Sequence, residues 1–90
     1  MLVRVEYDEA KNVKLRVGRG VCFDDVLEAI SQGGLVAVER HHNVAKYPNQ
    51  GLLIVRISRY AYVVPFVESE SVLFLKTVFP SRKYTKVYLS

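Results

Sequence analysis

The chain has 90 residues, half of them hydrophobic, with a formal net charge of +4 and a single cysteine. This length predicts one domain, residues 1–90, and six tyrosines with four phenylalanines supply large side chains for a core, which excludes a disordered chain. One cysteine cannot form an internal disulfide bond, which fits a reducing cytosol. The first residues include acids instead of the apolar run of a secretory signal, and no apolar stretch is long enough to cross a bilayer. We therefore expect a soluble, cytoplasmic protein.

The first part of the chain predicts a strand followed by a helix. Residues 2–7 alternate apolar and polar side chains, as half-buried strands do. Asp8 can cap a helix over residues 9–17, because its carboxylate accepts hydrogen bonds from the unpaired N–H groups of the first turn. Gly18 and Gly20 then end this helix.

A second helix follows, and the pattern for it is clearer. Four apolar side chains at helical spacing give it one hydrophobic face: Phe23, Val26, Leu27 and Ile30. Acidic residues in its early turns suit the positive end of the helix dipole. Gly33 and Gly34 mark its end.

The rest of the chain predicts strands. Runs rich in β-branched and aromatic residues, bounded by turn residues, indicate strands over residues 35–39, 52–58, 60–67 and 72–79. Ser58 and Arg59 form a hairpin turn, and Pro65 predicts an edge position, a bulge or a strand end. A turn or short helix over residues 81–89 follows. The order β-α-α-β-β-β-β predicts an α+β fold with a single antiparallel sheet and two helices packed on one face.

Charge is distributed unevenly along the chain. Six of the nine acids lie in the first third, and none follows Glu70. The segment after Glu70 is basic, with four cations: Lys76, Arg82, Lys83 and Lys86. This asymmetry fits an anionic partner, either a nucleic acid or an acidic protein, and equally a solubilising basic tail.

Two tyrosines, Tyr84 and Tyr88, lie among these cations. Their rings could stack on bases and their hydroxyls could bind phosphate. They are four residues apart, so on a helix they would share one face and could instead pack against the sheet. The interleaving of basic and aromatic side chains favours a nucleic acid over a plain basic tail.

Two adjacent histidines, His41 and His42, occur in the polar loop over residues 40–50. On an extended chain their side chains point in opposite directions, so they could not readily share one ion, and no other ligand stands at a recognised spacing. We therefore predict no metal site and no cofactor. An imidazole in this loop could act as an acid or base, or could simply be solvated.

Two stretches resemble a known family, the BrnT-type toxins. Residues 5–30, VEYDEAKNVKLRVGRGVCFDDVLEAI, are similar to the opening strand and the two helices of that family, with matches at Tyr7, Asp8, Lys11, Asn12, Gly20, Val21, Phe23, Asp24 and Asp25. Residues 74–89, FLKTVFPSRKYTKVYL, resemble its closing strand and S-A-R-x-A-T turn, on which Ser81, Arg82 and Thr85 fall. With YPNQ and YVVPFVE, the chain looks closest to a branch of small BrnT-like bacterial proteins.

The resemblance implies a fold related to the RelE toxins and membership of a type II toxin–antitoxin pair. Toxins of such pairs are ribonucleases that slow translation, and the antitoxin binds both the toxin and operator DNA. RelE-like nucleases use no metal, because the ribose 2′-hydroxyl attacks the adjacent phosphate and cationic side chains stabilise the charge that develops. The expected partners are RNA and a cognate antitoxin, in a homodimer or a heterotetramer.

The resemblance also implies roles for particular residues. Arg82, on the S-x-R turn, is the expected centre of charge stabilisation, with Lys76 and Lys83 as helpers. His41 or His42 could serve as the acid or base. The expected RNA contacts are basic and aromatic side chains of the loop and of the C-terminal segment: Arg40, Lys46, Tyr84, Lys86 and Tyr88.

The chain departs from the family at two places. Cys22 replaces the serine that caps the second helix, which weakens the cap by up to ~1 kcal/mol. After the fourth strand, where many members read His-Thr-Glu-Arg, residues 65–70 contain neither histidine nor arginine. Three functions therefore stay open: a ribonuclease toxin, a non-catalytic RelE-like module that pairs with a DNA-binding antitoxin, and an orphan RNA-binding domain.

Overall fold

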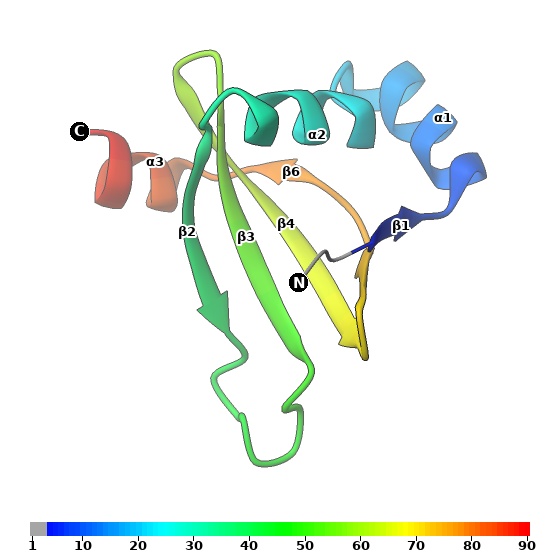
Figure 1. Ribbon diagram of the computed structural model, residues 1–90. Helices are drawn as coiled ribbons and strands as arrows, with labels where there is room; N and C mark the ends of the chain where they lie inside the picture. Colours follow the sequence, from blue (N-terminus) through cyan, green and yellow to red (C-terminus); the bar gives the residue numbers. More distant parts are fainter. Residues whose placement is uncertain (1–3) are drawn as a thin grey trace.

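The computed structural model of the chain describes residues 4–90 (Figure 1). Its elements follow in the order β1 Arg4–Tyr7, α1 Glu9–Arg19, α2 Phe23–Ser31, β2 Leu35–Arg40, β3 Gln50–Ile57, β4 Tyr60–Ser69, β5 Val72–Leu75, β6 Phe79–Pro80 and α3 Arg82–Leu89. The α+β class with a single sheet is confirmed. The first predicted strand is present from Arg4 onward, and its first two positions lie outside the described residues. Within residues 4–90, no helix is both long enough and apolar enough to span a membrane.

The sheet is mixed, so the prediction of a wholly antiparallel sheet is wrong. Its strands lie in the order β1-β5-β4-β3-β2, and β6 pairs with a separate part of β4. Strand β1 pairs with β5 in parallel, with Arg4 opposite Val72 and Tyr7 opposite Leu75. The direction follows from the connections: α1 and α2 carry the chain from β1 at one edge to β2 at the other, and three antiparallel pairings bring β5 back beside β1.

One capping side chain and a glycine set the limits of α1. The Asp8 carboxylate accepts the N–H of Ala10 at 2.8 Å, as predicted for an N-cap. The helix ends at Gly20, whose φ of 76° is left-handed and disfavoured for residues with a Cβ. Gly18 continues the helix instead of ending it, so α1 is two residues longer than predicted.

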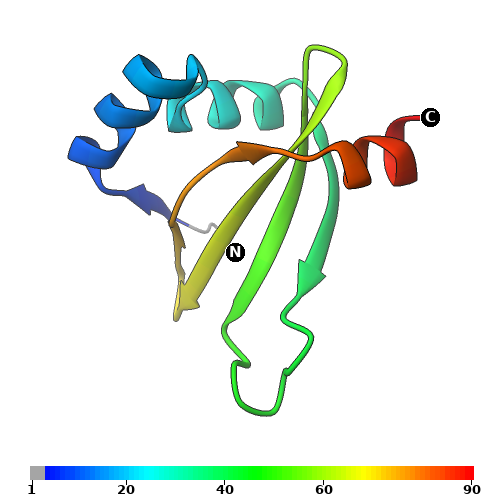
Figure 2. The same cartoon turned by 180° about the vertical axis from the view of Figure 1, so that it is seen from behind.

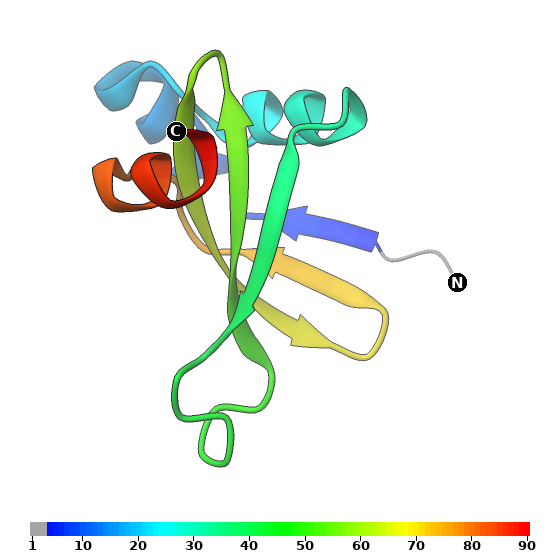
Figure 3. The same ribbon diagram turned by 90° about the vertical axis from the view of Figure 1, so that its left-hand side faces the viewer.

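The sheet packs a core on each face. Helices α1 and α2 share one face, where Phe23 and Val26 of α2 are fully buried in the larger core cluster. Helix α3 lies against β4 on the opposite face (Figures 2 and 3). There Tyr84 packs against a smaller buried cluster of Ile54, Ala61 and Val63. The predicted placement of two helices on one face is thus observed, and the third helix covers the other face.

The strand predicted over residues 72–79 is interrupted at the point where it passes Pro65 of β4. Residues 72–75 form β5 and residues 79–80 form β6, and the two pair with parts of β4 on either side of this proline. The carbonyl of Pro65 accepts the N–H of Lys76 at 2.8 Å, but proline has no N–H with which to return the bond. The chain leaves the sheet at this point. One continuous strand over residues 72–79 is therefore wrong. Pro65 itself lies inside β4 and pairs with Leu52 of β3, so the interruption occurs in the neighbouring segment and not in the strand that contains the proline.

Two further local features agree with the sequence. Ile57 pairs with Tyr60 across a two-residue turn, in which Ser58 adopts a φ of 61°. The C-terminal segment is a helix rather than a turn. Helix α3 begins after Ser81, whose hydroxyl oxygen accepts the N–H of Tyr84 at 3.1 Å.

Candidate functional site

A groove of about 510 Å³, called here the basic groove, gathers most of the predicted site residues. Its lining comes from the end of β2 and the following loop, from β3 and β4, from the residue after β5 and from the start of α3: Glu39, Arg40, His41, His42, Gln50, Gly51, Leu52, Pro65, Phe66, Lys76, Lys83 and Tyr84. Six of the ten predicted site residues line it: Arg40, His41, His42, Lys76, Lys83 and Tyr84. Segments far apart in sequence thus place cationic, imidazole and phenol groups around one cavity.

The cations of the basic groove differ in their availability to a ligand. Arg40 donates to the Glu68 carboxylate at 3.1 Å, and its guanidinium lies 5.8 Å from the centre of the Phe66 ring. Lys76 and Lys83 are exposed, and neither forms an ion pair within residues 4–90. Lys76 therefore presents its charge to the groove, whereas Nζ of Lys83 lies 5.2 Å from the centre of the Tyr84 ring and the charge of Arg40 is partly neutralised.

The sequence did not single out Glu39, which joins α3 to the edge strand β2. Its carboxylate accepts the hydroxyl of Tyr84 at 2.9 Å and that of Tyr88 at 2.6 Å. These two hydrogen bonds, first that of Tyr88 and then that of Tyr84, lower the pKa of Glu39 below its ordinary value. Glu39 is the one acid in the predicted strand over residues 35–39, which is otherwise apolar, and this was the available signal.

The Glu39–tyrosine contact predicts how the attachment of α3 depends on pH. The hydrogen bonds to Glu39 raise the pKa of Tyr84 and Tyr88 above the usual tyrosine value. Their contribution to stability is therefore complete below about pH 10 and is lost as the pH rises through the raised values. The contribution of Glu39, whose pKa is lowered, is complete above about pH 4.3 and is lost as the pH falls through the lowered value.

Tyrosinate absorbance measured along an alkaline titration tests this contact. We expect the last phase of ionisation to shift toward neutral pH in Glu39→Gln, because an amide accepts the tyrosine hydroxyls without stabilising their protonated form electrostatically. Glu70→Gln, which removes an exposed acid from the turn after β4, is the matched control. Identical titration curves for wild type and Glu39→Gln would contradict the contact.

The two loop histidines stack on each other. The ring centres of His41 and His42 lie 4.4 Å apart at an interplanar angle of 24°. The ring centre of Tyr47 lies 4.5 Å from that of His41. The expectation that the two side chains point in opposite directions is wrong, because the strand has ended and the chain bends at His42. Nδ1 of His41 accepts the N–H of Asn43 at 3.0 Å, so in neutral His41 the proton is on Nε2.

The other four predicted residues lie outside the lining of the basic groove. Arg82 is exposed at the first position of α3, one residue before Lys83. Lys86 is exposed in the last turn of α3, and Tyr88 is connected to the groove through Glu39. Lys46 lies in the loop, with its Nζ 5.4 Å from the centre of the Tyr47 ring. The role of Arg82 stays a prediction from the family resemblance.

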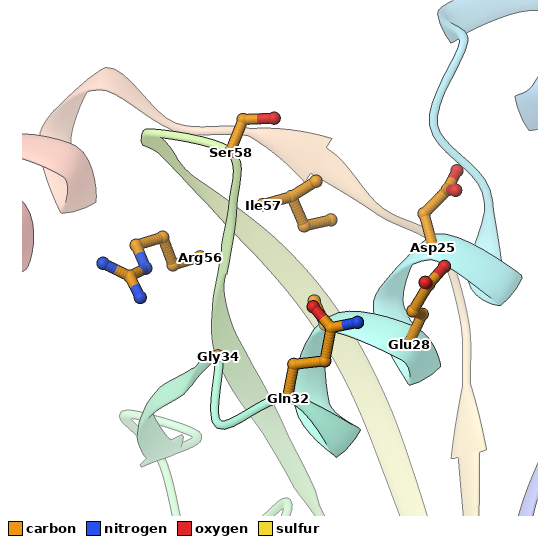
Figure 4. Close-up of a pocket in the computed structure, with 8 residues that line it drawn as sticks. Asp25, Glu28, Gln32, Gly34, Arg56, Ile57 and Ser58 are labelled. Atoms are coloured by element: carbon orange, nitrogen blue, oxygen red, sulfur yellow. The ribbon is translucent and has the colours of Figure 1, made fainter.

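A second cavity, of about 260 Å³, lies between α2 and the turn that joins β3 to β4 (Figure 4). Asp25 and Glu28 project from α2 on one side of it, while the guanidinium of Arg56 points away from them (Figure 4). Asp25 already accepts the backbone N–H of Cys22 at 2.9 Å, which is the acidic half of a capping box at the start of α2. Two carboxylates repel phosphate, so this cavity does not suit RNA.

Comparisons with known proteins do not place the chain in a family. No family model matches it, and no curated protein or solved structure shows significant similarity to it. Within the part of the chain that the structure describes, no cluster of three or more histidine, cysteine, aspartate or glutamate side chains is arranged to hold a metal ion. The geometry of the basic groove is therefore the main basis for assigning a function.

Proposed function

We propose that this protein is a metal-independent endoribonuclease, the toxin of a type II toxin–antitoxin pair of the BrnT type. The observation that carries the proposal is the basic groove, in which Lys76, Lys83 and the two loop histidines line one cavity. Cations that stabilise a developing phosphate charge, beside imidazoles that can accept and donate a proton, are the groups that RNA cleavage through the 2′-hydroxyl needs. The resemblance of residues 5–30 and 74–89 to the BrnT-type toxins supports the same function.

In the proposed reaction, the 2′-hydroxyl of one nucleotide attacks the phosphorus that joins it to the next. A base takes the hydroxyl proton, the bond from phosphorus to the 5′-oxygen breaks, and an acid gives that oxygen a proton. The products are a 2′,3′-cyclic phosphate and a 5′-hydroxyl. Lys76 and Lys83 stabilise the additional negative charge on the phosphate oxygens, and His41 and His42 are the proton carriers.

Cleavage of single-stranded RNA by the purified protein in EDTA tests the proposal. We expect products that end in a 2′,3′-cyclic phosphate and no cleavage of the same sequence as DNA, which lacks the attacking hydroxyl. Replacing His41 and His42 together by alanine should lower the rate by about 100-fold or more, because both proton carriers are removed. Production of the wild type in a bacterium should stop translation, and the double variant should not.

The control for this experiment is Lys14→Ala, which removes an exposed charge from α1 on the other face of the sheet. Circular dichroism of each variant shows whether the fold is kept. Well-folded wild-type protein that neither cleaves RNA nor arrests translation would overturn the proposal.

A non-catalytic module that pairs with an antitoxin is the alternative function, and one surface favours it. An apolar groove of about 300 Å³ lies beside α2, on the face of the sheet opposite α3, lined by Val5, Leu27, Ile30, Leu35, Val38, Arg40, Leu53, Phe66, Glu68, Leu73 and Leu75. Leu35 is 41% exposed and Val38 is 50% exposed. In both functions, we propose, an antitoxin segment covers this apolar surface.

A further inference from the structure

The loop between β2 and β3 holds a set of aromatic rings beside the basic groove. His41 contacts both His42 and Tyr47, with ring centres 4.4 Å and 4.5 Å apart. Nζ of Lys46 lies 5.4 Å from the centre of the Tyr47 ring and covers part of it. His42 is exposed, and within the described residues its one aromatic neighbour is His41. The His42 side chain is therefore accessible to a ligand.

The loop is ordered by its own hydrogen bonds. The N–H of His41 donates to the carbonyl of Gln50 at 3.0 Å, which continues the pairing of β2 with β3. Asn43 donates its N–H to Nδ1 of His41 at 3.0 Å and accepts the N–H of Tyr47 through its carbonyl at 2.9 Å. The Asn43 side chain accepts the N–H of Lys46 at 3.3 Å. These bonds hold the rings in place before any ligand arrives, which lowers the entropic cost of binding.

We propose that His42, backed by His41 and Tyr47, is a platform on which an unpaired RNA base stacks while the neighbouring phosphate lies in the basic groove. This inference rests on the proposed function, and it defines the substrate as single-stranded RNA. A base inside a duplex has both faces covered by its neighbours and cannot reach an exposed ring. Stacking on an aromatic ring tolerates every base, so the platform selects strandedness and position rather than sequence.

Binding of an RNA that cannot react separates this platform from catalysis. The probe is a fluorescent single-stranded oligonucleotide with a 2′-O-methyl group on every ribose, which removes the attacking hydroxyl, and affinity is measured by fluorescence anisotropy. His42→Ala should weaken binding by about five- to 150-fold, the range that one base–aromatic stack contributes. His42→Phe, which keeps a flat ring, should bind nearly as well as wild type. Val44→Ala, at an exposed apolar position in the same loop, is the control.

A series of the same oligonucleotides, each with one abasic site, locates the stacked base. We expect one position at which the missing base weakens binding to wild type but not to His42→Ala. A fully paired duplex should bind no better to wild type than to His42→Ala. Unchanged affinity in His42→Ala would overturn the platform, even if unmodified RNA is still cleaved. Loss of affinity in a protein that cleaves no RNA would support the platform and overturn the nuclease.

Discussion

Replacing Lys76 by alanine is expected to lower the rate of RNA cleavage by about 100- to 1000-fold, the usual cost of losing one group that stabilises a developing charge. Lys76 is exposed and lines the basic groove, so its loss should remove charge without damaging the core. Lys76→Arg should retain part of the activity, because the cation is kept but its position changes. The rate is measured in single turnover with saturating protein, so that weaker RNA binding does not contribute.

Arg82→Ala is the informative comparison for this prediction. The family resemblance puts Arg82 at the centre of the site, whereas Lys76 lines the basic groove and Arg82 does not. We expect Arg82→Ala to weaken RNA binding and to change the single-turnover rate much less than Lys76→Ala. The opposite result, with cleavage lost in Arg82→Ala and kept in Lys76→Ala, would show that the reaction takes place at the start of α3 outside the groove.

The features that the sequence predicted well depend on residues close together along the chain. The cap at Asp8 and the hairpin turn at Ser58 are each decided within a few positions. Pro65 was also informative, because a residue without an N–H cannot pair fully with a neighbouring strand. The sequence therefore predicted the elements from β1 to β4, although α1 ends at Arg19 instead of residue 17, β3 begins at Gln50 instead of residue 52, and β4 ends at Ser69 instead of residue 67.

The features that the sequence missed depend on contacts between distant segments. Strands β1 and β5 are far apart in the sequence and pair in parallel, with Arg4 opposite Val72. No local pattern specifies that these two strands run in the same direction. The part that Glu39 plays in the site depends on β2 and α3 lying side by side, with Tyr84 and Tyr88 directed at its carboxylate. The stacking of the histidines likewise follows from a bend that their own sequence does not show.

The residues that carry the N-terminal resemblance form a structural joint between α1 and α2. The hydroxyl of Tyr7 donates to Asp24 at 3.1 Å, and the Tyr7 ring lies 4.8 Å from that of Phe23. Asn12 donates to Asp24 at 3.1 Å and accepts the backbone N–H of Phe23 at 2.8 Å. These matching positions thus connect β1, α1 and α2, and the residues of the proposed chemistry lie elsewhere, in the β2–β3 loop, after β5 and in α3.

Asn12→Ala is expected to lower the free energy of unfolding by about 2 to 4 kcal/mol, because it leaves the buried N–H of Phe23 without a partner and removes packed atoms. Asn12 is fully buried, so its polar groups are satisfied only by protein atoms. For a chain of this size the midpoint of thermal unfolding should fall by roughly 10 to 30 °C. Val17→Ala, at a position 82% exposed in the same helix, should change stability very little. Equal stability of the two variants in urea unfolding would show that the joint does not hold the helices together.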